Sequence, residues 1–201
     1  MKTLNLSFKN RGDKILESLA ELKFSELTEL NLLKNNITDI NPLTNVQLDK
    51  LLLLNLNHNL IKDLSPLKTK NLQKLKTLSL QHNIITDLTP LEEFNCKDLI
   101  VLLLDHNHIE DISSLSKVKF VHLEKLTLNN NKIKDINILS KVPFKDLKML
   151  SLYDNSIDDI SIFKNQIFKG LKTLWIYNNS FNAENYKDII IYLKSTIHDF
   201  L

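Results

Sequence analysis

Residues 99–122 read LIVLLLDHNHIEDISSLSKVKFVH, and their pattern of apolar residues returns every 24 residues along the chain. The apolar and amide positions of this copy are Leu99, Leu102, Leu104, Asn107, Ile109 and Ile112. The opening leucine recurs without a shift at Leu27, Leu51, Leu75, Leu123, Leu147 and Leu171. A fixed period of this length is typical of one supersecondary unit stacked on copies of itself. The period therefore predicts an elongated α/β solenoid.

Each unit opens with a segment that alternates apolar and polar residues, as in Leu75-Lys76-Thr77-Leu78-Ser79-Leu80. An alternation of two is the period of a β-strand, whose successive side chains point to opposite faces. We therefore expect Leu78 and Leu80 to point into the core, and Thr77, Ser79 and Gln81 to point outward.

An asparagine follows this segment in every unit. A buried amide both donates to and accepts from backbone groups, so it can satisfy polar atoms that stacking hides from water. We expect a purely structural ladder, formed by Asn35, Asn59, Asn83, Asn107, Asn131, Asn155 and Asn179.

A recurring aspartate then begins the return path of the first six units. Its carboxylate can accept backbone N–H groups at the start of a short helical turn, and a proline three residues later fixes φ there in the first three units. The aspartates are Asp39, Asp63, Asp87, Asp111, Asp135 and Asp159, and the prolines are Pro42, Pro66 and Pro90.

One further apolar position brings the chain back to the core three residues before each new unit. Cys96 occupies this position in its unit, so we expect a small buried side chain and not a reactive thiol. The equivalent residues are Phe24, Leu48, Leu72, Phe120, Phe144 and Phe168.

This order of leucines, asparagine and isoleucines resembles the leucine-rich-repeat superfamily over residues 27–181. The short return path "Asp-Ile-x-Pro-Leu" resembles the class found in bacterial internalins and in a regulator of protein phosphatase one. The 24-residue unit is two residues longer than is usual in that class. The resemblance implies a right-handed curved solenoid with parallel strands on the concave face and short 3₁₀ or helical turns on the convex back.

The two ends depart from the repeat, as the terminal units of a solenoid do. Residues 1–26 read as a degenerate N-terminal unit, with a strand around Leu4 and Leu6 and a helix over 13–22 that Asp13 caps. Seven repeats occupy 27–182. Residues 183–201 read as a C-terminal helix that covers the last repeat. We expect one domain over 1–201.

The composition excludes several classes of protein. With 43% hydrophobic residues, 25% charged residues and a net charge of +2, the chain has the composition of an ordered globular protein and no bias toward nucleic acid or membrane. The single cysteine rules out an intramolecular disulfide, and the start of the chain carries no apolar run that resembles a signal peptide. We therefore expect a cytoplasmic protein.

The sequence contains no glycine-rich phosphate loop, no nucleophile elbow and no close pair of Cys or His ligands. We accordingly expect no enzymatic activity, no cofactor and no metal. Function in such a scaffold depends on the surface that the repeat displays.

Residues 24 apart become neighbours on adjacent strands, so the outward strand positions form three columns on the concave face. The first is Glu29, Leu53, Thr77, Val101, Lys125, Met149 and Thr173. The second is Asn31, Asn55, Ser79, Leu103, Thr127, Ser151 and Trp175. The third is Leu33, Asn57, Gln81, Asp105, Asn129, Tyr153 and Tyr177.

Exposed aromatic residues on a rigid sheet dominate the energetics of protein interfaces, because they bury a large area at little entropic cost. We therefore predict that this face binds another protein. The alternative for its C-terminal end is that the last helix folds over the aromatic residues or that Trp175 only covers the last strand. The predicted contact residues are Leu53, Val101, Leu103, Asp105, Met149, Tyr153, Trp175 and Tyr177.

Other columns of the repeat suggest three alternative functions: metal binding, cation binding and nucleic-acid binding. His58, His82 and His106 follow three consecutive strands and offer imidazoles to a metal, but the same column holds lysine, asparagine and aspartate elsewhere. Their proximity should lower their pKa values. The aspartates of the return path suggest a cation site, although capping already explains them. An accessory role in binding nucleic acid would use the lysines of the convex side: Lys68, Lys70, Lys117, Lys119, Lys141, Lys145, Lys164 and Lys169.

Overall fold

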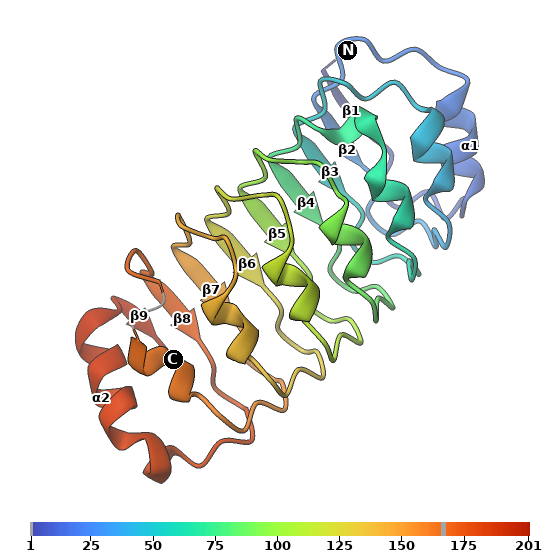
Figure 1. The fold of residues 1–201 in the computed structure, drawn as a ribbon. Coiled ribbons are helices and arrows are strands. Elements are labelled where there is room, and N and C mark those ends of the chain that lie inside the picture. Colours follow the sequence, from blue (N-terminus) through green and yellow to red (C-terminus); the bar gives the residue numbers. More distant parts are fainter. Residues whose placement is uncertain (1, 166–167) are drawn as a thin grey trace.

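The chain forms a single row of coils with a parallel sheet along one side (Figure 1). A computed structural model describes residues 2–165 and 168–201. Within these residues nine strands pair in chain order, each parallel to the next. They are β1 Thr3–Asn5, β2 Glu29–Asn31, β3 Leu53–Asn55, β4 Thr77–Ser79, β5 Val101–Leu103, β6 Lys125–Thr127, β7 Met149–Ser151, β8 Thr173–Trp175 and β9 Asp199–Phe200.

The pairing register follows the 24-residue period from β2 to β8. Leu30 pairs with Leu54, Leu54 with Leu78, and so on to Leu174. Each of these central leucines is buried, because the strand alternation turns it away from solvent. The predicted strands and the inward position of their central leucines are therefore confirmed. Ser79, expected to face outward, is instead buried.

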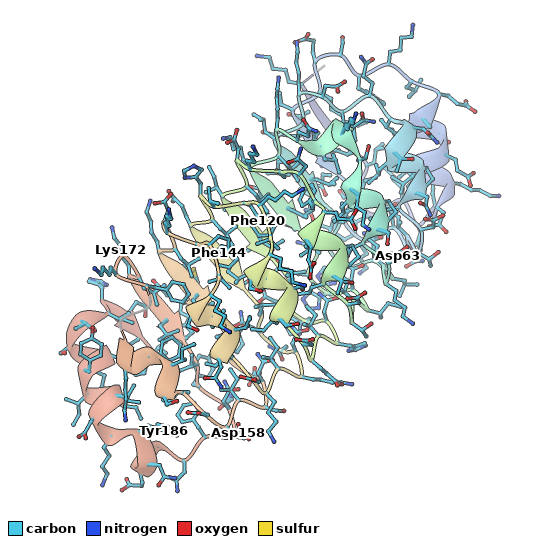
Figure 2. The ribbon with its side chains drawn as sticks, in the orientation of Figure 1. Asp63, Phe120, Phe144, Asp158, Lys172 and Tyr186 are labelled. Carbon is cyan, nitrogen blue, oxygen red and sulfur yellow. The ribbon has the colours of Figure 1, made fainter. Side chains whose placement is uncertain are left out.

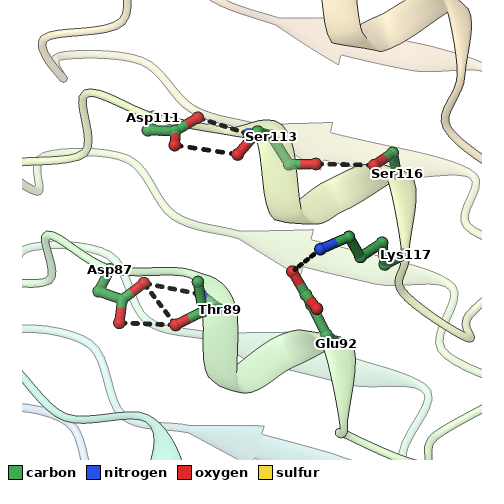
Figure 3. Close-up of polar contacts among 7 residues, drawn as sticks. All are labelled: Asp87, Thr89, Glu92, Asp111, Ser113, Ser116 and Lys117. Atoms are coloured by element: carbon green, nitrogen blue, oxygen red, sulfur yellow. Dashed lines mark hydrogen bonds and ion pairs between the residues drawn. The ribbon is translucent and has the colours of Figure 1, made fainter.

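Short 3₁₀ turns line the side opposite the sheet. The turns that follow the strands are η1 Asn41–Asn45, η2 Ser65–Lys68, η4 Thr89–Glu92, η5 Ser113–Ser116, η6 Asn137–Ser140 and η7 Ser161–Asn165, with an extra turn η3 at Lys70–Leu72. The recurring aspartate accepts the backbone N–H two residues ahead; for example, Ser113 donates to Asp111 at 2.7 Å and Thr89 donates to Asp87 at 2.8 Å (Figure 3). The predicted capping role is confirmed, and a proline occupies the first turn of η1, η2 and η4.

The apolar interior lies between the sheet and these turns. Phe120 and Phe144, on neighbouring coils, stack with ring centroids 5.9 Å apart (Figure 2). Cys96 is fully buried in the equivalent position of its coil, where its thiol donates to the carbonyl of Leu75 at 3.0 Å. Burial raises the pKa of this thiol to about 12, so the expected inert packing role of Cys96 is confirmed.

The asparagine ladder links each coil to the one before it. The Asn107 side chain donates to the carbonyls of Leu80 and Leu104, both at 3.0 Å, and accepts the N–H of Ile85 at 3.0 Å. One amide thus satisfies three backbone groups that solvent does not reach. The predicted structural role of these asparagines is confirmed.

Helix α1, Lys14–Ala20, covers the first coil and buries Ile15, Leu16 and Leu19. The prediction that Asp13 caps this helix with its side chain is wrong. The carboxylate instead accepts the N–H groups of Thr38 and Asp39 on the next coil, at 2.7 and 2.9 Å. Partial burial alone would raise the pKa of Asp13, but these hydrogen bonds outweigh burial and the pKa is lowered.

The C-terminal end contains a 3₁₀ turn, η8 Ala183–Tyr186, followed by helix α2, Lys187–Thr196. Ile189 and Leu193 of α2 are buried against the last coil, as expected. The prediction of one helix over residues 183–201 is wrong at its end, because α2 stops at Thr196 and residues 199–200 form strand β9 beside β8. No helix among the described residues is long and apolar enough to cross a membrane.

Candidate functional site

The strand register places the predicted contact residues in the expected columns of the concave face, which we define as the outward side of the sheet. The register aligns Leu53, Val101 and Met149 in one column, with Leu103 and Trp175 in the next. All five are partly exposed. Thr77 lies between Leu53 and Val101, so Leu53 is set apart from the pair on β5 by one strand.

Three aromatic side chains meet near the C-terminal end of the sheet: Trp175 on β8, and Tyr153 and Tyr177 two residues after the ends of β7 and β8. Figure 1 shows where these two strands lie. Tyr153 and Tyr177 stack with ring centroids 4.7 Å apart and planes at 3°. Trp175 lies 6.4 Å from Tyr153, tilted by 49°. We call these three residues the aromatic cluster. Tyr177 retains 41% of its exposure, so the cluster offers aromatic surface to solvent and α2 does not cover it.

Asp105 lies deeper than its column predicts. It is only 5% exposed, and its carboxylate accepts hydrogen bonds from Gln81 Nε2 at 2.5 Å, Thr127 Oγ1 at 2.6 Å and the backbone N–H of Asn129 at 2.9 Å. The prediction that Asp105 stands exposed as a contact residue is wrong. Small polar neighbours close around it because their donors satisfy a charge that cannot be buried alone.

The polar chain through Asp105 extends along the third column to the aromatic cluster. Asn129 Oδ1 accepts Ser151 Oγ at 2.6 Å and the backbone N–H of Tyr153 at 3.1 Å. Ser151 and Asn129 are buried although their positions alternate outward. These hydrogen bonds fix the backbone from which Tyr153 projects, so the cluster stands on a rigid base.

Two carboxylates beside the aromatic cluster are absent from the predicted site. Asp199, on β9, accepts the indole N–H of Trp175 at 3.2 Å. Asp154 follows Tyr153 and accepts Asn178 Nδ2 at 2.8 Å. Asp154 could have been found from its place directly after a column residue, whereas Asp199 depends on a strand that the sequence pattern does not reveal.

The three histidines of the strand exits stack face to face. Ring centroids of His58 and His82, and of His82 and His106, are 4.0 Å apart with planes at 11°. Parallel rings direct their in-plane nitrogens side by side and not toward one point. No group of three His, Cys, Asp or Glu side chains is arranged to hold a metal ion in residues 2–165 and 168–201.

Burial lowers the pKa of His82, and its neighbours His106 and His58 lower it further, while Asp105 opposes them. The direction agrees with the expected lowering at His82, where burial is the largest single cause and the two neighbouring histidines add to it. The backbone also explains the column: φ is between 51° and 55° at each exit position. Asn, Asp and His tolerate this left-handed region better than most residues, and they fill six of the seven positions: His58, His82, His106, Asn130, Asp154 and Asn178.

The lysines of the convex side are partly neutralised. Lys117 Nζ lies 3.3 Å from Glu92 (Figure 3), and Lys68 Nζ lies 2.8 Å from Glu93. Two lysines outside the set named for the convex side are also paired, Lys134 with Asp158 and Lys148 with Glu124. The alternation of both charges weakens the argument for a phosphate-binding stripe.

Comparisons with known proteins agree with this architecture. One family model, described as leucine rich repeat, matches residues 25–85, and a second, described as leucine rich repeats in two copies, matches residues 97–141. A search of curated proteins finds no match.

Several solved structures are similar to this chain. Internalin C2 of Listeria monocytogenes superimposes with a TM-score of 0.76 at 29% identity, over 99% of this chain and 79% of that one. An internalin, InlF, from the same bacterium gives 0.74 at 27% identity, over 98% and 59%. A plant peptide hormone receptor, RGFR1, in complex with RGF2 gives 0.63 at 24% identity, over 89% and 28%, which shows the fold alone. The chain therefore spans less than two thirds of InlF and of the plant receptor.

Proposed function

Because the chain belongs to the leucine-rich-repeat superfamily and its fold is that of the internalins, we propose that it is a non-enzymatic module that binds another protein through the concave face. Leucine-rich-repeat folds commonly serve protein–protein interaction. The observation that carries the proposal is the aromatic cluster of Tyr153, Trp175 and Tyr177, held at the sheet surface with Tyr177 41% exposed.

The chemistry of this face suits protein recognition. Tyrosine and tryptophan provide large, stiff contact surfaces, and they are enriched among the residues that dominate interface energies. Met149, Val101, Leu103 and Leu53 extend the apolar area toward the middle of the sheet. Asp105 supports the site because it accepts the backbone N–H of Asn129, and the side chain of Asn129 in turn accepts the backbone N–H of Tyr153.

The wider setting of the module is also a proposal. We infer one domain over residues 1–201, supported by the continuous sheet, and a cytoplasmic location, supported by the single cysteine. Microscopy of the tagged protein in its own cells tests the location.

The test compares capture of binding proteins by wild type and by a Tyr153→Ala/Tyr177→Ala double variant. We expect the double variant to lose at least about tenfold in affinity for a specifically captured protein, as truncation of aromatic anchors does. Phe8→Ala is the matched control, because Phe8 is 64% exposed and lies at the N-terminal end. Unfolding curves verify that each variant folds. Equal capture by wild type and the double variant contradicts the proposal.

A further inference from the structure

The aromatic cluster is bordered by carboxylates. Asp199 accepts the indole N–H of Trp175 at 3.2 Å, and Asp154 directly follows Tyr153. Asp105 lies two strands away, in the column of Tyr153. We propose that this end of the concave face recognises a cationic segment, rich in Arg or Lys, of the protein partner. This inference rests on the proposed function and specifies the chemistry of the partner.

Asp105 provides a negative charge that neutral groups alone stabilise. Its three hydrogen-bond donors are an amide, a hydroxyl and a backbone N–H. No ion pair within 4 Å involves Asp105 among residues 2–165 and 168–201. Because water screens this buried carboxylate poorly and its hydrogen-bond donors are neutral, its electric field reaches the surface of the sheet. The field raises the local concentration of cations there.

The surroundings of Tyr153 include two of these carboxylates. Burial raises the pKa of its phenol, and Tyr177, Asp105 and Asp154 raise it further. Two carboxylates therefore act on the ring that forms the centre of the aromatic cluster. A group placed against this ring experiences their attraction if it is positive and their repulsion if it is negative.

The rings themselves favour a cation. The faces of tyrosine and tryptophan carry negative quadrupole charge, which attracts ammonium and especially guanidinium groups. Arginine also stacks flat on aromatic rings and forms two hydrogen bonds with a carboxylate. Because the aromatic faces lie beside Asp154 and Asp199, one arginine side chain can stack on a ring and form hydrogen bonds with a carboxylate at the same surface.

One positive side chain of this region, Lys125, lies beside Met149 in the first column of the sheet. Lys125 opens strand β6, four residues before Asn129, which corresponds to about 13 Å along a strand. The column of strand exits contributes His106 and His82, and the pKa of His82 is lowered, mainly by burial, which disfavours its charged form. A phosphate-bearing partner such as RNA would meet the carboxylates, so the proposal excludes nucleic acid from this face.

The test titrates ¹⁵N-labelled protein with three end-capped hexapeptides, which alternate glycine with arginine, glutamine or glutamate. We expect the arginine peptide to shift the NMR signals of protein residues at β7 and β8. We also expect it to bind with roughly tenfold higher affinity than the glutamine peptide. The glutamate peptide should bind more weakly still. Equal affinities of the arginine and glutamine peptides, or binding of none of the three at this face, overturns the proposal.

A variant pair separates local charge from net charge. Asp154→Asn/Asp199→Asn keeps an oxygen acceptor for Asn178 and Trp175 but removes two charges, and it should lower the affinity for the arginine peptide about fivefold. Asp146→Asn/Asp158→Asn removes two charges from residues that pair with His122 and Lys134, and it should leave that affinity unchanged. If both double variants lose the same affinity for the arginine peptide, the effect comes from net charge, and this result contradicts a local site.

Failure of this inference is distinguishable from failure of the proposed function. If capture of the partner depends on Tyr153 and Tyr177 while the arginine and glutamine peptides bind equally, the concave face binds protein without a preference for cations. If the arginine peptide binds at β7 and β8 but the Tyr153→Ala/Tyr177→Ala variant captures binding proteins as well as wild type, the protein-binding proposal fails instead.

Discussion

At the residue scale, buried polar side chains decide how neighbouring coils join. Asn107 connects three backbone groups on two coils. Asp105 connects the side chains of Gln81 and Thr127 and the backbone N–H of Asn129, on the two coils beside its own. Spacing alone predicted the asparagines, because a polar residue recurs there between apolar ones. Burial of Asp105 was not predictable, because strand alternation points it outward and only its donors draw it inward.

Replacing Asn107 by alanine should therefore destabilise the protein by about 3 kcal/mol, since two carbonyls and one N–H lose their partner away from water. Equilibrium unfolding in urea measures the loss. Asn95→Ala is the control, because Asn95 is exposed, and it should change the free energy of unfolding by less than about 0.5 kcal/mol. Similar effects of the two substitutions contradict the role assigned to the ladder.

The stacked histidines make stability depend on pH. The pKa of His82 in the folded protein is lower than its ordinary value of 6.5. The unfolded chain therefore binds more protons below pH 6.5, and stability falls as the pH falls through that value. Wild type should lose more stability between pH 7.5 and 5.5 than His82→Asn, which keeps a residue suited to a φ of 54°. Identical pH dependence in urea denaturation of both proteins refutes this assignment.

At the element scale, the strands and turns follow from the repeat, but the C-terminal end does not. The apolar spacing within residues 183–201 predicted a helix, and α2, Lys187–Thr196, confirms it for that part. Strand β9 has only two residues, Asp199 and Phe200, and aspartate has low strand propensity. It forms because β8 offers an open edge: the N–H of Asp199 donates to Lys172 at 3.0 Å and that of Leu201 donates to Leu174 at 3.1 Å. Such a tertiary cause leaves no local signal.

Helix α2 should protect the amides of the last coil, and few others, from hydrogen exchange. Leu193 is 3% exposed against that coil, so Leu193→Ala should cost about 2–5 kcal/mol locally. Because repeats contact mainly their neighbours, amide hydrogen exchange should rise at β8 and stay nearly unchanged at β4. Ile191→Ala in the same helix is the control, since Ile191 is 66% exposed. A uniform rise along the sheet argues against local protection by α2.

At the scale of the whole molecule, the solenoid separates structural positions from functional ones. Leucines, asparagines and aspartates recur because each coil needs them, so only the positions that vary between coils can carry recognition. The columns were predictable because strand pairing follows the period. The position of Asp199 beside the aromatic cluster was not predictable, because Asp199 reaches Trp175 only through β9.

Hydroxyl-radical footprinting, which oxidises exposed methionine and aromatic side chains, tests the concave face most directly. The protein is labelled alone and in complex with its captured partner. We predict that oxidation of Met149, Tyr153, Trp175 and Tyr177 falls several-fold in the complex, as burial of interface anchors requires, while Phe8, at the N-terminal end, reacts as before. Protection of other residues, with the aromatic cluster oxidised at its free rate, would contradict recognition through this face.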